Sequence, residues 1–261
     1  MTFRTSDKAS MEYFKKRNVP VEIQRFSFEG KSIRYLESGK KERTVPLIVF
    51  VHGAPGSADN FYSYLADSIL LQKARMVTLD RLGYGYSAYG KSETSIAKQA
   101  AAVRALVDRF DNDTVLLVGH SYGGPIVGKY AMDFPNRVAA AIMLAPLNDP
   151  DSEPIFWFAH FARWKLTKWM LAKPLQVSGD EKFSHAAELK KIETGWQAIQ
   201  VPIVHIHGDK DRLAPPQENI DFSKKYIPAP YLKMIVLPDT DHFIPWSDFE
   251  LIRQELLLFL E

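Results

Sequence analysis

Short apolar runs alternate with longer amphipathic stretches along most of this chain. Two runs near the start change polarity at every second residue and are separated by Glu29-Gly30-Lys31, so they predict an antiparallel hairpin of Val21–Phe28 and Ser32–Ser38. Six later runs are almost continuous in Val, Ile and Leu, which is typical of strands covered on both faces. They are Leu47–His52, Arg75–Leu79, Thr114–Gly119, Val138–Ala145, Ile203–His207 and Leu232–Leu237.

Helical periodicity fills the intervals between these runs. From Ile96 to Phe110 the apolar residues recur about every 3.6 positions on one face, and Trp246–Leu260 has a similar stripe. Strands that alternate with helices indicate a parallel sheet with helices on both faces. The pattern therefore predicts an α/β fold with a mostly parallel, eight-stranded sheet.

One long segment breaks the alternation. Residues 148–200 place 53 residues between two predicted strands, where a plain crossover needs roughly 10–12. We expect an inserted helical cap there, with the core domain formed by residues 21–147 and 201–261. Residues 1–20 are expected to be an N-terminal extension, in which Met11–Arg17 form either a short helix on the domain or a disordered lead.

Composition narrows the function classes. Of 261 residues, 46% are hydrophobic, which is enough for the core of a globular protein. The absence of cysteine excludes disulfides, a thiolate nucleophile and cysteine-ligated metals. A net charge of +2 is too balanced for a nucleic-acid partner. Because no apolar run approaches ~18–20 residues and no signal peptide is visible, we expect no integral membrane segment and, by default, a cytoplasmic location.

The strongest chemical signal is the sequence Gly119-His120-Ser121-Tyr122-Gly123, which follows a predicted strand. Gly-x-Ser-x-Gly in this setting predicts a tight strand-to-helix turn that projects the serine hydroxyl from the sheet. The glycines remove Cβ atoms that would collide in such a turn. The following helix directs backbone N–H groups and positive dipole at the reacting centre. Ser121 is therefore the candidate nucleophile.

With this motif the chain resembles the α/β-hydrolase superfamily, from about Val21 to Glu261. Four further segments match the family pattern in the family's order: His52–Ser57, Asp80–Ser87, His207–Pro215 and Asp239–Phe243. The resemblance implies an α/β-hydrolase fold with a short helical cap. It also implies a serine hydrolase that needs no cofactor.

The resemblance further implies a catalytic triad in the order Ser121, Asp211, His242. A serine hydroxyl needs a base that is held by a third group, and His242 is the only histidine after Asp211. Family spacing selects Asp211 as the acid. Asp209, two residues before it, and Asp149, after an earlier strand, remain alternatives.

An oxyanion hole needs two N–H donors. Matching the family's motifs assigns them to the backbone of Tyr122, after the nucleophile, and of Ala54. Pro55 cannot donate, which supports Ala54, and Gly53 allows the loop to approach the substrate closely. His52, which begins this loop, is a candidate residue of the substrate pocket.

The predicted cap holds four of the five tryptophans of the chain. At helical spacing, Trp157, Phe161 and Trp164 share one apolar face, opposite a second apolar face of the same predicted helix. A helix that is apolar on two sides is expected to be sandwiched, with one side toward a pocket. We therefore take these three aromatic residues as candidates for the substrate pocket, with plain core packing as the alternative.

His205 and His207 are two residues apart on a predicted strand, so both face the same way. Such a pair could bind a metal, but no third ligand is evident, and we expect no metal and packing in the strand instead.

The sequence thus predicts a serine hydrolase that cleaves a small to medium, mostly apolar ester or related acyl compound through an acyl-enzyme. The same triad would serve a carbon–carbon bond hydrolase, an aminopeptidase, an acyltransferase or a perhydrolase. A non-catalytic ligand-binding or receptor protein on the same fold is the alternative of another class. The expected partner is a small-molecule substrate, and the sequence leaves the oligomeric state open.

Overall fold

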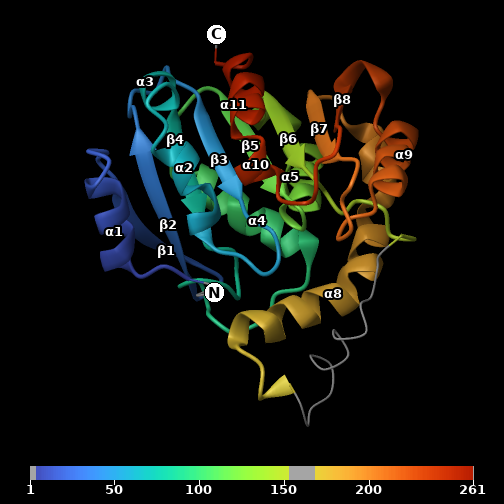
Figure 1. Ribbon diagram of the computed structural model, residues 1–261, viewed down its shortest axis with the longest axis horizontal. Coiled ribbons are helices and arrows are strands. Elements are labelled where there is room, and N and C mark those ends of the chain that lie inside the picture. Colours follow the sequence, from blue (N-terminus) through green and yellow to red (C-terminus); the bar gives the residue numbers. More distant parts are fainter. Residues whose placement is uncertain (1–3, 153–167, 261) are drawn as a thin grey trace.

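One eight-stranded sheet forms the centre of the computed structural model, which describes residues 4–152 and 168–260 (Figure 1). Its spatial order is β1-β2-β4-β3-β5-β6-β7-β8. β2 runs antiparallel to β1 and β4, and all other neighbours are parallel. The predicted fold class is confirmed. The strands are β1 (Glu22–Phe28), β2 (Lys31–Gly39), β3 (Leu47–Val51), β4 (Arg75–Leu79), β5 (Val115–His120), β6 (Ala140–Leu144), β7 (Ile203–Gly208) and β8 (Leu232–Leu237).

Helices cover both faces of this sheet. Since side chains alternate along a strand, Val49 of β3 joins one core and Phe50 joins the other. The helices that pack in the core of Val49 are α4 (Ile96–Val107), α5 (Gly123–Asp133) and α9 (Pro216–Tyr226). Those in the core of Phe50 are α1 (Asp7–Lys15), α2 (Tyr62–Leu65), α3 (Leu70–Lys73), α10 (Ile244–Ser247) and α11 (Phe249–Leu257). Short 3₁₀ turns are η1 (Ala58–Phe61), η2 (Pro135–Arg137) and η5 (Ala229–Tyr231).

Two predictions near the C-terminus need correction. The single helix expected over Trp246–Leu260 is divided at Asp248, whose φ of −117° and ψ of 35° end α10 before α11 begins. β8 was expected to be covered on both faces, but Lys233 and Val236 are exposed. β8 is the last strand at one edge of the sheet. A run of apolar residues in the sequence does not show which strand lies at an edge, so the exposure of β8 was not predictable from it.

The described part of segment 148–200 is mainly helical. It contains α8 (Lys173–Ile192) and the 3₁₀ turn η4 (Glu193–Ala198). α8 lies beyond the carboxyl ends of the parallel strands, at the bottom of the view in Figure 1. Leu189 and Ile192, near its end, are buried in the same core as α4 and α5.

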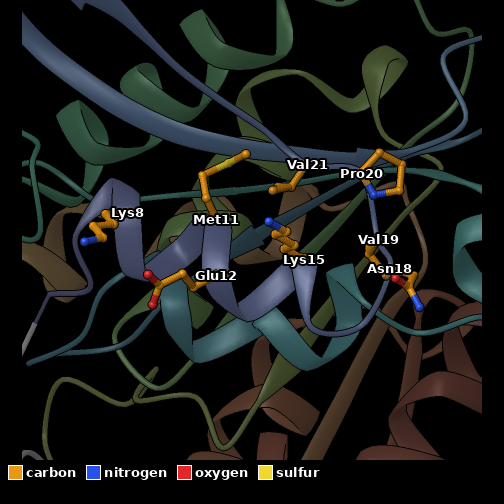
Figure 2. A pocket seen from close by; sticks show the side chains of 8 residues that line it. All are labelled: Lys8, Met11, Glu12, Lys15, Asn18, Val19, Pro20 and Val21. Atoms are coloured by element: carbon orange, nitrogen blue, oxygen red, sulfur yellow. The ribbon is translucent and has the colours of Figure 1, made fainter.

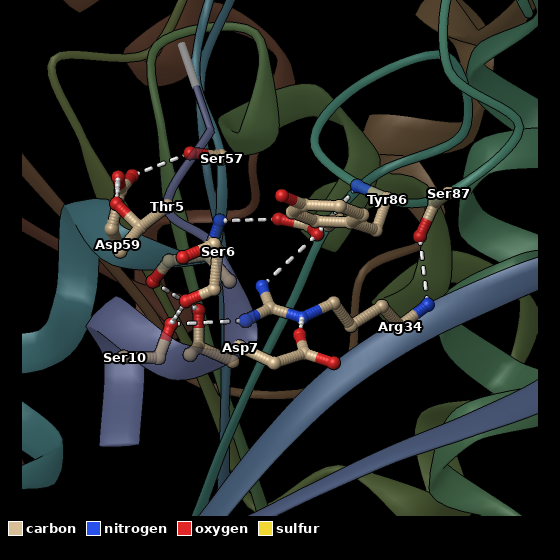
Figure 3. Close-up of polar contacts among 12 residues, drawn as sticks. Thr5, Ser6, Asp7, Ser10, Arg34, Ser57, Asp59, Tyr86 and Ser87 are labelled. Carbon is tan, nitrogen blue, oxygen red and sulfur yellow. Dashed lines mark hydrogen bonds and ion pairs between the residues drawn. The ribbon is translucent and has the colours of Figure 1, made fainter. Parts of the chain in front are cut away.

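The N-terminal segment is tied to the domain by a helix. α1 buries Phe14 completely, so the first of the two alternatives for Met11–Arg17, a short helix on the domain, is correct. Arg34 of β2 lies at the centre of the polar contacts in Figure 3, donating to Asp7 at 2.8 Å and to Ser10 Oγ at 3.0 Å. These bonds hold α1 against the outer strands of the sheet.

A surface pocket lies between α1 and the segment that leads into β1 (Figure 2). Met11, Lys15 and Val21 are among its eight lining residues, none of which is a candidate catalytic residue. Across residues 4–152 and 168–260, no helix has the length and apolarity that crossing a membrane requires.

Candidate active site

Ser121 stands at the turn between β5 and α5 with a φ of +54°, a left-handed conformation that costs energy for a residue with a side chain. A Cβ atom at Gly119 would lie 2.2 Å from the carbonyl oxygen of Gly123. One at Gly123 would lie 2.3 Å from the carbonyl oxygen of Val51. The turn therefore has the strain and the close backbone approaches that the Gly-x-Ser-x-Gly motif predicts.

Asp211 and His242 meet although 31 residues separate them along the chain. Asp211 follows β7, His242 lies in the loop after β8, and Nδ1 of His242 is 2.7 Å from Oδ2 of Asp211. The other carboxylate oxygen of Asp211 accepts the backbone N–H groups of Leu213 and Ala214, each at 2.8 Å. Because a carboxylate only accepts, the proton of a neutral His242 ring is on Nδ1, which leaves Nε2 able to take a proton.

His120, the residue before Ser121, binds the loop of His242 to the turn between β5 and α5. Its Nε2 donates to the carbonyl oxygen of His242 at 3.0 Å, and the two rings lie 4.9 Å apart. Burial, and then the neighbouring His242, lowers the pKa of His120 to about 3, so the ring is a neutral donor at ordinary pH. Within residues 4–152 and 168–260 no hydrogen bond joins Ser121 Oγ to His242; such bonds often tighten only when substrate binds.

Asp211 has a second histidine partner that the sequence did not predict. Nε2 of His207 lies 3.2 Å from Oδ2 of Asp211 and 3.1 Å from the carbonyl oxygen of Ala214. Behind it, His205 Nε2 is 2.9 Å from His207 Nδ1, and Ser223 Oγ is 2.9 Å from His205 Nδ1. Both partners of His207 Nε2 only accept, so the proton of a neutral His207 ring is on Nε2. His207 Nδ1 then accepts from His205 Nε2, and His205 Nδ1 accepts from the hydroxyl of Ser223. Every donor in this hydrogen-bonded row therefore points toward Asp211.

The hydrogen bonds to Asp211 stabilise its charged form. Burial alone would raise the pKa of Asp211, but the hydrogen bonds from His207 and His242 outweigh burial and bring the pKa below its usual value. The expectation that His205 and His207 face the same way is correct, and their ring nitrogens are engaged in hydrogen bonds. In the described ranges, no three His, Cys, Asp or Glu side chains are grouped so as to hold a metal ion.

The two alternative acids lie in other surroundings. Asp209 is exposed, and Asp149 accepts the backbone N–H of Asp151 at 3.0 Å in its own turn. Neither makes a hydrogen bond to His242 in the part of the chain that the structure describes, whereas Asp211 does.

The loop that begins at His52 touches the nucleophile. A Cβ atom at Gly53 would lie 2.9 Å from Cβ of Ser121, so only glycine lets Ala54 follow this closely. Tyr122, the other predicted oxyanion residue, is adjacent to Ser121 at the start of α5. The loop that leads into Ala54 and the residue Tyr122 therefore both lie next to the same serine.

His52 is completely buried and binds backbone atoms. Its Nε2 accepts the N–H of Arg81 at 3.0 Å, and its Nδ1–H donates to the carbonyl oxygen of Gly53 at 2.7 Å. Burial and the charge of Arg81 lower the pKa of His52 well below its usual value, so the ring stays neutral. This places His52 behind the loop rather than on a surface open to substrate. The other pocket candidates, Trp157, Phe161 and Trp164, lie outside the described residues.

Sequence reasoning missed two residues near this loop, the buried ion pair of Arg81 and Glu181. Arg81 stands directly after Asp80 in the segment Asp80–Ser87, which matches the family pattern, while Glu181 belongs to the predicted cap. A carboxylate in a helix normally indicates a solvated face, so no local signal marked Glu181 as buried.

Known proteins share this architecture. A family model described as the alpha/beta hydrolase fold matches residues 46–170. A bifunctional esterase/perhydrolase of Acinetobacter calcoaceticus is 25% identical over 272 residues, with coverage of 89% of this chain and 97% of that protein. The acetyltransferase component of the acetoin cleaving system of Cupriavidus necator is 31% identical over 124 residues, with coverage of 48% and 32%, so the chain spans about a third of that relative.

Solved structures agree with the family model. The carboxylesterase CesB of Bacillus subtilis superposes with a TM-score of 0.71 at 19% identity, with coverage of 97% of this chain and 96% of that structure. At this identity the likeness shows a common fold. Taken with the family model that matches residues 46–170 and with the eight-stranded sheet, it means that the chain has the α/β-hydrolase fold.

Proposed function

We propose that the chain is a serine hydrolase that cleaves carboxylic esters through an acyl-enzyme. The observation that carries the proposal is the hydrogen bond of 2.7 Å between His242 and Asp211, in a loop that His120 attaches to the strained turn of Ser121. Nucleophile, base and acid occur in the chain order typical of this fold. The esterase named among its relatives supports the same reaction class.

In the proposed reaction, Ser121 Oγ attacks the ester carbonyl carbon while Nε2 of His242 takes the hydroxyl proton. Asp211 holds the ring through Nδ1 and stabilises the imidazolium. The negative charge that develops on the carbonyl oxygen is bound by the N–H groups of Ala54 and Tyr122. His242 then gives its proton to the leaving alcohol, and water releases the acid from Ser121 by the same steps in reverse order.

We assign substrate selection to the predicted cap over residues 148–200. α8, within it, reaches the carboxyl ends of the strands, and ligand sites of open α/β sheets lie at those ends. The aromatic residues Trp157, Phe161 and Trp164 favour a mostly apolar acyl or alcohol group of small to medium size.

The test is ester turnover by Ser121→Ala beside a matched control. Removing the nucleophile is expected to lower kcat by about 10⁴-fold or more on p-nitrophenyl esters of graded acyl length. Ser38→Ala, on strand β2, removes a buried hydroxyl that donates to the carbonyl oxygen of Leu65 in α2, and it should leave kcat unchanged. Full activity of Ser121→Ala would refute the proposal.

A fluorophosphonate probe separates an enzyme from a binding protein on the same fold. An active serine becomes covalently phosphonylated, so the wild-type chain should be labelled at Ser121 and the alanine variant should not. A wild-type chain that binds apolar esters but stays unlabelled would favour the ligand-binding alternative.

Perhydrolysis is a second candidate, which the esterase/perhydrolase among the relatives favours. Hydrogen peroxide would replace water as the attacking group on the acyl-enzyme, forming a peracid and restoring the hydroxyl of Ser121. Measuring peracid with a carboxylic ester and hydrogen peroxide, in wild type and in Ser121→Ala, decides whether this reaction occurs at the same serine.

A further inference from the structure

A buried ion pair connects α8 to the loop beside the nucleophile. The guanidinium of Arg81 meets the carboxylate of Glu181 through two bonds, Nη1 to Oε1 at 2.7 Å and Nη2 to Oε2 at 3.1 Å. The hydroxyl of Tyr84 donates to the same carboxylate at 2.6 Å. The side chains of Arg81 and Glu181 are 1% and 0% exposed, although 100 residues separate them along the chain.

The same guanidinium binds two backbone carbonyls of the loop that begins at His52 and contains Ala54. Nε of Arg81 donates to the carbonyl oxygen of His52 at 2.8 Å, and Nη2 donates to that of Gly53 at 3.0 Å. In a planar trans peptide the N–H points opposite to the carbonyl of the preceding residue. Fixing the Gly53 carbonyl therefore fixes the direction of the Ala54 N–H, which is one of the two proposed oxyanion donors.

The residue one turn further along α8 contacts the side chain of Tyr122, whose backbone N–H is the other proposed donor. His185 stacks on the ring of Tyr122, with centroids 4.4 Å apart and planes inclined by 25°. Glu181 and His185 are four residues apart and so lie on the same face of the helix. Arg81 also lies over the ring of Tyr122, 4.8 Å from its centroid, so Arg81, Glu181, His185 and Tyr122 form one continuous cluster.

We propose that Arg81 and Glu181 are positioning residues, through which α8 sets the orientation of the oxyanion donor Ala54. This inference rests on the proposed function and assigns that site a control element within the predicted cap. In the described part of the chain, neither residue forms a hydrogen bond to Ser121, Asp211 or His242. Movement of α8 away from the sheet would withdraw Glu181 and release the Gly53–Ala54 peptide, so that oxyanion stabilisation and cap position are linked.

The chemistry of the pair fits this role. Burial would lower the pKa of Arg81, but the charge of Glu181 outweighs burial and raises it, so the guanidinium stays charged and keeps all its donors. Buried ion pairs add little to stability compared with well-packed apolar side chains of similar volume. A pair retained for stability alone is therefore replaceable by apolar residues, whereas a pair retained to aim a peptide is not.

The test uses this difference. Glu181→Gln replaces the charged acceptor by an amide and is expected to lower kcat about 10-fold with less than about 2-fold change in KM, because loss of a whole oxyanion donor costs ~10²–10³. The double variant Arg81→Met with Glu181→Met is expected to recover thermal stability but not kcat. Recovery of kcat together with stability would overturn the proposal, since it is the result of a merely structural pair.

Inhibition supplies a readout that does not depend on turnover. A trifluoromethyl ketone forms an oxyanion on Ser121, so its affinity should fall in parallel with kcat in Glu181→Gln, while substrate KM changes little. The same readout applies to Tyr84→Phe, a milder change at the same carboxylate, should Glu181→Gln not fold. Unchanged inhibitor affinity in whichever of these variants folds would contradict a role for Glu181 in positioning.

A matched control is the ion pair of Arg75 and Glu37, whose atoms are 2.7 Å apart and in which Glu37 is only 2% exposed. Arg75 begins β4, so this pair lies at the end of the sheet away from Ser121. Glu37→Gln makes the same chemical change to a buried carboxylate and should cost stability while leaving kcat unchanged. The proposed function fails separately, by absence of fluorophosphonate labelling at Ser121 in the wild-type chain. With labelling intact and kcat of Glu181→Gln at the wild-type value, only the inference about α8 fails.

Discussion

His207 donates to the same carboxylate oxygen of Asp211 that binds His242, with Nε2 3.2 Å from Oδ2. The acid of the proposed triad is thus held between two imidazole rings. Each donor favours the charged carboxylate, and His205 and Ser223 fix the tautomer of His207 from behind. Asp211 is consequently held in position by side chains as well as by its own loop.

Replacing His207 by phenylalanine is the first prediction. The ring shape remains, but the donor to Asp211 is lost, and a hydrogen bond to a charged group contributes about 1.5–3 kcal/mol. We expect kcat/KM for esters to fall about 10-fold or more, with a smaller loss in His207→Gln, which keeps an N–H donor. Ser223→Ala, three hydrogen bonds from Asp211, should change kcat/KM by less than about 3-fold. Equal activity of the phenylalanine variant and the wild type would argue against any role of the second donor.

The identity of the acid is the second prediction. Asp211→Asn preserves shape but cannot hold the Nδ1–H of His242 as a carboxylate does, so kcat should fall by roughly 10⁴-fold. Asp209→Asn and Asp149→Asn remove carboxylates that do not bond to His242 in the described structure and should retain nearly full kcat. A severe loss in either of these variants, with Asp211→Asn active, would transfer the role of the acid.

The strands and the turn at Ser121 were predictable because both depend on local sequence. Runs such as Leu47–Val51 are apolar at every position since both faces of the strand are covered, and Gly-x-Ser-x-Gly records the steric demands of one turn. Motif order selected Asp211 and His242 as candidates, and the structure shows the hydrogen bond between them.

The remainder required the three-dimensional structure. Nothing near Glu181 in the sequence indicates that a helical carboxylate is buried against Arg81, because that contact depends on how a long segment returns to the sheet. The link of His205 and His207 to Asp211 likewise needs the path of the loop after β7. The division into core and cap at residues 148 and 200 remains a prediction.

The close approach of Gly53 to Ser121 gives the third prediction. Gly53→Ala would place a Cβ atom 2.9 Å from Cβ of Ser121 and 3.2 Å from the carbonyl oxygen of His120, so relieving the contact requires a shift next to Ser121. We expect kcat to fall at least about 10-fold, with a loss of about 1–3 kcal/mol in stability from overpacking. Gly195→Ala is a matched control, because its Cβ would lie 2.8 Å from Sδ of Met132, a flexible side chain away from the site. Similar kcat losses in both variants would contradict the prediction.

Acid sensitivity gives the fourth prediction. Burial lowers the pKa of His120 to about 3 and those of His52 and His205 well below their usual value, whereas unfolded histidine titrates near 6.5. Between about pH 6.5 and pH 3 the unfolded chain therefore binds more protons, so the free energy of unfolding falls as the pH falls, by up to about 1.4 kcal/mol per pH unit for each histidine.

Denaturant unfolding of wild type and His120→Gln at a series of pH values measures this effect. Glutamine keeps a donor for the carbonyl oxygen of His242 but has no titrating ring, so the slope between pH 6 and pH 4 should decrease by about one proton. Above about pH 7 both proteins hold neutral side chains at this position, and their slopes should agree. An unchanged acid slope in His120→Gln would mean that His120 already takes up its proton in the folded state, against the burial that the structure shows.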